Sequence, residues 1–265
     1  MRKLFLTVLA LLVVGGAAQA QSSAVGMLIM LINGDYYAWN ESDPAPQRLT
    51  TWGYNFRPAL SPDGKFLAYM SWSPMTVEAI RRSGGIGGGE LPGDIKLFDL
   101  ATAQETIIAG QPADASFFIE GTADKAIMRS TPAWSPDGRR LAWTEFDYPG
   151  ELLNRLVVYD VTTRESRVIV PLLPAQGGVP SPMPVLWSGS GIIVRSITPR
   201  PNVTTYQEDV TFLVYDDTGA LLATVPLPQT DADLMIDYLL VQHNGQDYIA
   251  VLYNNAAWVL LNPLT

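Results

Sequence analysis

A turn sequence that occurs twice limits the folds open to this chain. Residues 61–69 read SPDGKFLAY and residues 135–143 read SPDGRRLAW, so the same four residues precede an apolar stretch at both places. Proline presets φ at a turn corner, aspartate hydrogen-bonds the nearby backbone, and glycine adopts the left-handed conformation that a Cβ disfavours. Each copy therefore predicts a tight turn between two antiparallel strands. We interpret these residues as structural: Ser61, Pro62, Asp63, Gly64, Ser135, Pro136, Asp137 and Gly138.

The rest of the chain repeats this pattern of turns and strands. Short runs rich in Val, Ile, Tyr, Trp and Leu alternate with Gly, Pro, Asn and Asp, which is typical of strands joined by turns. Complete units begin near residues 57 and 131, a degenerate unit begins near 183, and a last unit stops after its third strand. Such units predict an all-β fold, a β-propeller of four-stranded antiparallel blades. With the strands expected in residues 27–49, the chain fits about five blades or a truncated six-bladed ring.

The second complete unit predicts individual strands. We expect them over residues 132–135, 140–145, 155–160 and 166–170. Trp134, Leu141 and Trp143 are expected to pack between neighbouring blades, because sheets stacked face to face lie about 10 Å apart and need large side chains between them.

Two segments carry a family resemblance. TPAWSPDGRRLAW and RPALSPDGKFLAY resemble the WD40-like PD40 repeat of the TolB-type β-propellers, which are exported bacterial proteins. The resemblance extends to the aromatic-aspartate pairs that end three later strands: Phe98-Asp99, Tyr159-Asp160 and Tyr215-Asp216. It implies a six-bladed ring that acts as a platform for binding other proteins.

The N-terminus has the order of a secretory signal peptide. Arg2 and Lys3 precede an apolar run from Leu4 to Val14, and small residues follow up to Ala20. This run is shorter than the ~20 residues that a membrane-spanning helix needs. We therefore expect a signal peptide over residues 1–20, cleaved after Ala20, and a periplasmic or secreted propeller domain over residues 21–265 with no stable membrane span. The alternative is a retained N-terminal anchor.

Composition argues against several kinds of site. The formal net charge of −9 disfavours binding to nucleic acid, whose phosphates require clustered Lys and Arg. The chain has no cysteine and one histidine, His243, so neither a disulfide nor a His-rich metal site can form. A catalytic triad would need His243, but no G-x-S-x-G motif is present. The acidic stretch TDADLMID lacks the glycine and the final glutamate of a calcium loop. We expect no metal and no cofactor.

The connections between the expected strands fall into two classes. Tight turns join the first strand of a blade to the second and the third to the fourth, whereas the other connections are long. In an antiparallel blade the two classes emerge on opposite faces, so the long connections share one face. Binding residues concentrate on loops that a rigid scaffold holds. The long connections cover residues 73–93, 109–129, 146–154, 171–182, 198–209 and 228–235.

We expect a noncatalytic exported propeller that binds a protein or peptide of the cell envelope through this face. The glycine-rich stretch after Arg82 is interpreted as a flexible link, with a partner-binding flap as the other possibility. The alternative function is a small glycan-acting hydrolase or lyase, with acidic residues such as Glu145 and Asp147 at the channel mouth. The partner-binding candidates are Arg81, Arg82, Glu145, Asp147, Tyr148, Tyr206, Glu208 and Asp209.

Overall fold

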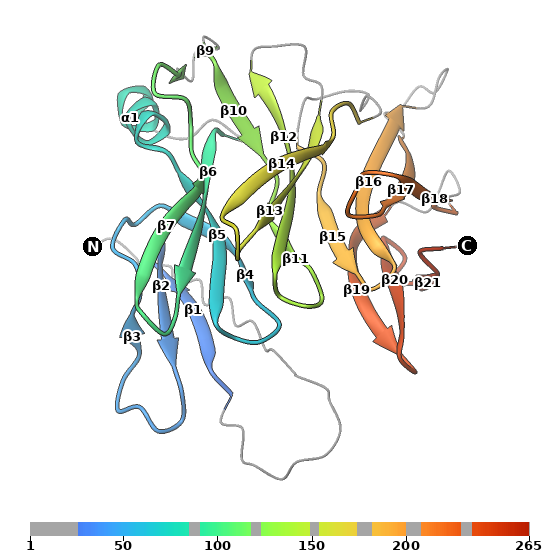
Figure 1. Cartoon of the computed structure of the whole chain (residues 1–265), viewed down its shortest axis with the longest axis horizontal. Coiled ribbons are helices and arrows are strands. Elements are labelled where there is room, and N and C mark those ends of the chain that lie inside the picture. Colours follow the sequence, from blue (N-terminus) through green and yellow to red (C-terminus); the bar gives the residue numbers. More distant parts are fainter. Residues whose placement is uncertain are drawn as a thin grey trace.

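A computed structural model of the chain shows a nearly all-β molecule. It describes residues 26–84, 91–117, 123–148, 154–173, 182–199, 208–228 and 235–264, so the expected signal peptide lies outside the described residues. Within this part of the chain, five antiparallel sheets are arranged as the blades of a propeller (Figure 1). The predicted fold of about five blades is confirmed.

The strands of each blade follow one another in the sequence. Blade 1 contains β1 (Leu28–Ile32), β2 (Asp35–Trp39) and β3 (Gln47–Arg48). Blade 2 contains β4 (Asn55–Leu60), β5 (Phe66–Trp72), β6 (Gly93–Asp99) and β7 (Gln104–Ala109). Blade 3 contains β10 (Ala126–Arg129), β11 (Ala133–Trp134), β12 (Arg140–Tyr148), β13 (Arg155–Asp160) and β14 (Glu165–Val170).

The C-terminal half continues in the same way. Blade 4 contains β15 (Val185–Ser188), β16 (Gly191–Pro199), β17 (Glu208–Tyr215) and β18 (Leu221–Pro226). Blade 5 contains β19 (Met235–His243), β20 (Gln246–Tyr253) and β21 (Trp258–Leu261). Between blades 2 and 3, the short strands β8 (Ser116–Phe117) and β9 (Ala123–Asp124) form a sheet of their own.

Both Ser-Pro-Asp-Gly turns form as predicted. In the second copy, Gly138 N donates to Ser135 O at 2.9 Å, and Gly138 has a positive φ of 69°. Asp137 Oδ1 accepts hydrogen bonds from Arg139 N at 3.1 Å and from the Ser135 hydroxyl at 2.6 Å. The first copy has the same contacts, and its Gly64 has a φ of 70°. The aspartates therefore hold the turns, and the glycines supply the left-handed backbone.

Apolar side chains fill the space between successive blades. Trp134, Leu141 and Trp143 of blade 3 pack in one buried cluster with Ile95 of blade 2, as predicted. The Trp134 indole also donates to Ala59 O of blade 2 at 2.8 Å, which satisfies its one donor across the interface. Equivalent clusters join blades 1 and 2, blades 3 and 4, and blades 4 and 5.

The innermost strands are more irregular than the sequence predicted. In place of one strand over residues 132–135, blade 3 has β10 and β11, which both pair with β12. The interruption contains Pro132, which has no N–H to offer the ladder. In blade 2 the pairing of β4 with β5 shifts between Phe56 and Ala59, again beside a proline, Pro58.

The connection after β5, which the sequence indicated only as a long connection over residues 73–93, contains a helix that was not predicted. Helix α1 (Pro74–Ser83) begins after Ser73, whose side chain caps its first turn, and it ends at Gly84 with a φ of 73°. A serine N-cap, proline in the first turn and glycine at the C-terminus are ordinary boundaries of a helix. The glycine run that follows lies outside the described residues.

Candidate functional site

The long connections of blades 2 to 4 emerge on one face of the propeller, as their antiparallel strand order requires. We call it the long-loop face, and among the described residues it comprises residues 49–54, 73–84, 110–117 and 145–148. In Figure 1, α1, β9 and the end of β12 lie at the top of the molecule, whereas the turns that lead into β5 and β12 lie towards the bottom. We call the opposite side the short-turn face.

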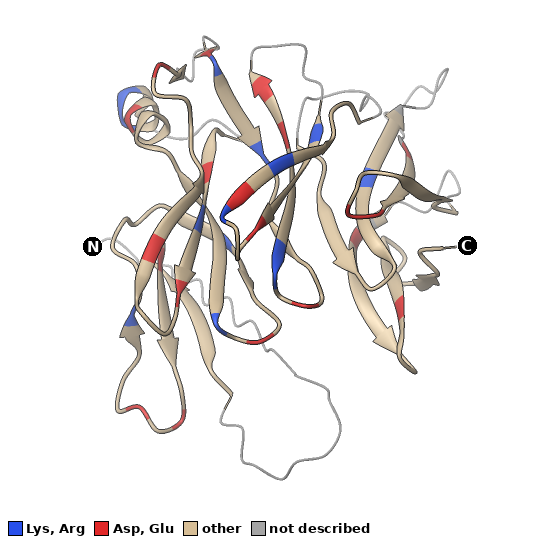
Figure 2. Ribbon diagram, in the orientation of Figure 1, with Lys and Arg blue, Asp and Glu red and all other residues tan. Residues whose placement is uncertain are grey.

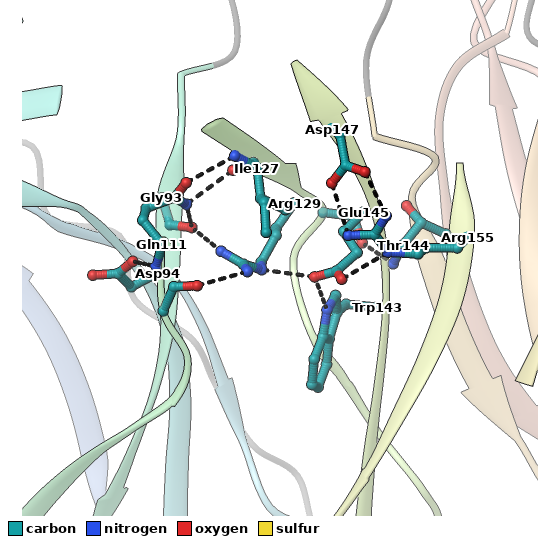
Figure 3. A network of polar contacts seen from close by, with 12 residues as sticks. Gly93, Asp94, Gln111, Ile127, Arg129, Trp143, Thr144, Glu145, Asp147 and Arg155 are labelled. Atoms are coloured by element: carbon teal, nitrogen blue, oxygen red, sulfur yellow. Dashed lines mark hydrogen bonds and ion pairs between the residues drawn. The ribbon is translucent and has the colours of Figure 1, made fainter. Parts of the chain in front are cut away.

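A buried arginine joins blades 2 and 3 below the long-loop face (Figure 3). Arg129 is 4% exposed, and its guanidinium donates to Gly93 O and Gly110 O, each at 2.9 Å. Its Nε donates to Glu145 Oε2 at 2.8 Å. All three guanidinium nitrogens thus have acceptors, and these acceptors come from both blades.

Glu145, one of the predicted binding residues, is occupied by this network. Its side chain lies 11% exposed between Arg129 and Arg155, with Arg155 Nε at 3.0 Å from Oε1. The Trp143 indole Nε1 donates to Oε2 at 3.0 Å. Burial alone would raise the pKa of Glu145, but the positive charge of Arg129, the Trp143 donor and Arg155 outweigh burial and hold the pKa below its ordinary value. Glu145 is therefore a buried carboxylate with its donors already in place.

Asp94 completes the contact with blade 2. It accepts a hydrogen bond from Gln111 N at 3.1 Å, and burial raises its pKa although Arg129 lies nearby. The Gln111 side chain donates to Gly93 O and to Ile127 O, each at 2.9 Å, and accepts from Ile127 N at 2.8 Å. We call the group formed by Asp94, Gln111, Arg129, Glu145 and Arg155 the inter-blade clasp, because its contacts hold adjacent sheets together.

The other predicted binding residues lie on different blades. Asp147, with a side chain 59% exposed, forms a bidentate pair with Arg155, which brings it next to Glu145. Arg81 and Arg82 occupy the last turn of α1, where Arg82 pairs with Glu78 at 2.9 Å.

The structure describes only some of the remaining candidate binding residues. Tyr148 ends β12 and is half-buried. Asp209 lies exposed in β17, opposite Thr198 of β16. Glu208 begins β17, but its side chain and all of Tyr206 lie outside the described residues.

Sequence reasoning missed a cluster of aromatic side chains at the start of blade 2. Its ring centroids lie in series: Trp52 to Tyr54 at 5.7 Å, Tyr54 to Trp72 at 6.0 Å and Trp72 to Phe56 at 5.6 Å. Trp52 is 37% exposed, and the other three rings are half-buried. We call these four residues the aromatic ridge. The sequence signals three of the four rings through the alternation of Trp52, Tyr54 and Phe56 at every second position, but it does not signal Trp72.

A buried aspartate fixes the backbone that carries the ridge. Asp35 is 4% exposed, and its Oδ2 accepts from Arg48 Nη2 at 2.6 Å. Its Oδ1 accepts from the Thr50 hydroxyl at 2.9 Å, from Gly53 N at 2.9 Å and from Asn55 Nδ2 at 3.2 Å. Four donors from residues 48–55 therefore converge on one carboxylate of blade 1.

Close backbone contact adds to this constraint. Asn55 N donates to Gly34 O at 2.9 Å, and a Cβ on Gly34 would lie 2.0 Å from Gly53 O. The turn before β2 can approach residues 53–55 in this way only because glycine occupies position 34. The connection from blade 1 to blade 2 is therefore a rigid loop that presents Trp52 and Tyr54.

Two further observations concern the described residues alone. No group of three or more His, Cys, Asp or Glu side chains in this part of the chain could hold a metal ion. No helix there has the length and apolar character needed to cross a membrane. Figure 2 shows Lys and Arg interspersed with Asp and Glu over the blades.

Several solved structures are similar to this chain. Oligogalacturonate lyase from Vibrio parahaemolyticus aligns with a TM-score of 0.51 and 12% identity over 88% of this chain and 57% of the lyase. TolB from Acinetobacter baumannii aligns with a TM-score of 0.47 and 15% identity over 86% of this chain and 49% of TolB. A putative TolB from Agrobacterium tumefaciens gives 0.46 and 11%, over 88% of this chain and 76% of that protein.

These likenesses concern the fold. The chain spans about half the length of the first two structures, at 57% and 49%. No protein-family model matches the chain, and no curated protein matches it. Of the three alignments, the one with the lyase has a TM-score above 0.5, and at 12% identity it shows a similarity of fold alone.

Proposed function

We propose that this protein is an exported, noncatalytic propeller that binds a protein or peptide through its long-loop face. The observation that carries the proposal is the aromatic ridge, where four adjacent rings remain partly exposed and two of them, Trp52 and Tyr54, lie on a loop that Asp35 holds rigid. Exposed aromatic side chains on a rigid support are typical anchors of protein interfaces, because they contribute a large contact area with little loss of side-chain freedom.

The acidic residues at the same face favour a scaffolding role over catalysis. A general acid for glycan cleavage needs a raised pKa so that it carries a proton near neutral pH. The pKa of Glu145 is instead lowered by Arg129, Trp143 and Arg155 against the effect of burial, and its oxygens already accept three hydrogen bonds. The geometry therefore does not favour the alternative of an acid-base enzyme centred on Glu145.

The expected signal peptide supports the choice of partner. A cleaved signal peptide over residues 1–20 would place the mature chain in the periplasm or outside the cell, so we expect a protein or peptide of the cell envelope. The exposed Asp147 and the basic end of α1 would lie at the edges of this contact.

The proposal is tested by affinity capture with matched variants. The purified protein is immobilised and exposed to a cell-envelope extract of its own organism. Trp52→Ala and Asp147→Ala change the long-loop face, whereas Lys65→Ala and Arg139→Ala change the two turns of the short-turn face. We expect a partner retained by the unchanged protein to be lost with Trp52→Ala and kept with both turn variants. Loss only with the turn variants would show that the opposite face binds.

A further inference from the structure

A half-buried arginine between blades 4 and 5 has no anionic partner among the described residues. Arg195 belongs to β16, and its guanidinium carbon lies 5.5 Å from the ring centroid of Tyr238 in β19. The other buried or half-buried arginines in this part of the chain are Arg129, Arg140 and Arg155, and each pairs with a carboxylate. Arg195 forms no ion pair with a described residue, so its charge is not compensated there.

Arg140 shows the same arrangement with its anion present. It lies in β12 of blade 3, and its guanidinium carbon is 5.3 Å from the ring centroid of Trp187 in β15 of blade 4. Asp217, which follows β17, pairs with this guanidinium. Arg195 repeats the contact one blade further on, from β16 to β19, without a carboxylate among the described residues. A ligand could supply the group that Asp217 supplies to Arg140.

The terminal nitrogens of Arg195 are the part of the side chain that a ligand can contact. Its Nε is fully buried without an acceptor, whereas Nη1 and Nη2 are not fully buried and form no hydrogen bond with the described residues. Two guanidinium nitrogens match the spacing of the two oxygens of one carboxylate. A partly desolvated charge without a partner is also unfavourable, so an anion that pairs with it is bound more strongly than at an exposed arginine.

Tyr238 adds a second donor at this place. Its hydroxyl is not fully buried and forms no hydrogen bond with the described residues. Burial raises the pKa of Tyr238 to about 12, so the hydroxyl keeps its proton at neutral pH. Asp237, the neighbouring acid on β19, is exposed and accepts a hydrogen bond from Tyr238 N. One positive charge and one neutral donor suit a singly charged carboxylate better than a phosphate, which carries about two negative charges.

We infer that Arg195 and Tyr238 form a binding site for a carboxylate group of the partner peptide, from an acidic side chain or from its C-terminus. This inference rests on the proposed function and names the chemical group that blades 4 and 5 bind. Tyr238 lies in the half of β19 nearer to the long connection over residues 228–235, which is the side of the long-loop face. The carboxylate would accept from both terminal nitrogens of Arg195 and from the Tyr238 hydroxyl.

Carbon-detected NMR of the arginine guanidinium groups tests this chemistry near neutral pH. The Nε–Cζ signal of Arg195 is identified by its loss in Arg195→Lys. Four probes are titrated at constant ionic strength: a Gly-Glu-Gly peptide with both termini blocked, the blocked Gly-Gln-Gly peptide, Gly-Gln-Gly with a free C-terminal carboxylate, and sodium phosphate. We expect at least one carboxylate peptide to shift the Arg195 signal with about tenfold or higher affinity than the blocked glutamine peptide and phosphate. The tighter of the two carboxylate peptides identifies the source of the group.

Two arginines serve as controls in the same spectra. Arg140 already pairs with Asp217, and Arg139 is exposed in the turn before β12, so neither signal should respond at concentrations that saturate Arg195. Tyr238→Phe keeps the ring and removes the hydroxyl, and it should weaken binding about two- to tenfold. Arg195→Lys keeps the charge but loses the paired nitrogens, and it should reduce retention of the partner in affinity capture. Unchanged far-ultraviolet circular dichroism confirms that each variant is folded.

Three results would overturn the inference. These are no shift of the Arg195 signal with either carboxylate peptide, binding of the blocked glutamine peptide or phosphate as tightly as the better carboxylate peptide, or an equal response of Arg139 or Arg140. If Trp52→Ala abolishes capture while the Arg195 signal does not respond, the carboxylate site is wrong and the proposed function stands. If the Arg195 signal responds but capture is lost only with the turn variants, the carboxylate site stands and the proposed function is wrong.

Discussion

At the scale of single residues, the surroundings of Glu145 decide its role. In the sequence it is one acid near a long connection, a candidate for partner binding and, under the alternative function, for catalysis. In the structure Arg129 reaches it from β10, Trp143 from the same strand and Arg155 from β13. Because of these three partners, Glu145 is part of the inter-blade clasp.

Glu145→Gln tests this role through the pH dependence of stability. The folded-state pKa of Glu145 lies below its unfolded value, so its contribution to stability is complete above the unfolded pKa of about 4.3 and is lost as the pH falls through the folded pKa. We expect the variant to lose about 3 kcal/mol of unfolding free energy at pH 7, as when one member of a buried ion pair is removed. The difference from the unchanged protein should shrink below about pH 4.

Urea midpoints between pH 7 and pH 3 measure this difference. Asp94 acts in the opposite sense, because its pKa is raised: the charged carboxylate lowers the stability of the fold at neutral pH, and protonation at lower pH removes this loss. Both proteins contain Asp94. Asp147→Asn is the matched control, since Asp147 shares Arg155 but is 59% exposed. A deficit for Glu145→Gln that stays constant from pH 7 to pH 3 would contradict the lowered pKa.

At the scale of elements, the sequence was most informative where structure is local. The Ser-Pro-Asp-Gly turns, the strand at residues 155–160 and the packing of Trp134 and Trp143 follow from neighbouring residues, and the structure confirms them. Helix α1 was missed although Ser73 and Gly84 mark its ends, because the glycine run beyond it was given more weight.

The aromatic ridge could not be found from local pattern alone. Trp52, Tyr54 and Phe56 alternate along the chain, but Trp72 joins them only through the pairing of β4 with β5 and the Trp52 hydrogen bond to its carbonyl. Likewise, nothing near Asp35 in the sequence shows that residues 48–55 fold back onto its carboxylate. Long-range pairing sets both features.

The loop that carries the ridge gives a prediction at this scale. Asp35→Asn removes the charge that Arg48 pairs with and leaves donors around position 35 poorly matched. We expect the unfolding free energy to fall by about 1–3 kcal/mol. Affinity for the partner should also fall, although no ring of the ridge is changed, because residues 49–54 lose their anchor. Urea denaturation measures the first effect, and affinity capture of the partner measures the second.

A charge-matched control separates the anchor from overall charge. Glu41→Gln makes the same change in net charge at an exposed position after β2 and should alter neither quantity. If Asp35→Asn destabilises the protein but binds the partner normally, the Asp35 carboxylate does not position the ridge.

At the scale of the whole molecule, strand order links fold to function. In blades 2 to 4 the tight turns lie on one face and the long connections on the other, so the repeated turn sequence identifies the short-turn face. The sequence could therefore indicate which face to examine. It could not show which residues of that face remain available, because long-range contacts place Glu145 in the inter-blade clasp and leave the aromatic ridge partly exposed.

Amide hydrogen exchange with and without the captured partner tests most directly whether the long-loop face binds. The partner should slow exchange in residues 49–56 and 72–84 and leave the turns at residues 61–66 and 135–140 unchanged. Slower exchange confined to those two turns, with none in residues 49–56, would place the partner on the short-turn face and contradict the proposed function.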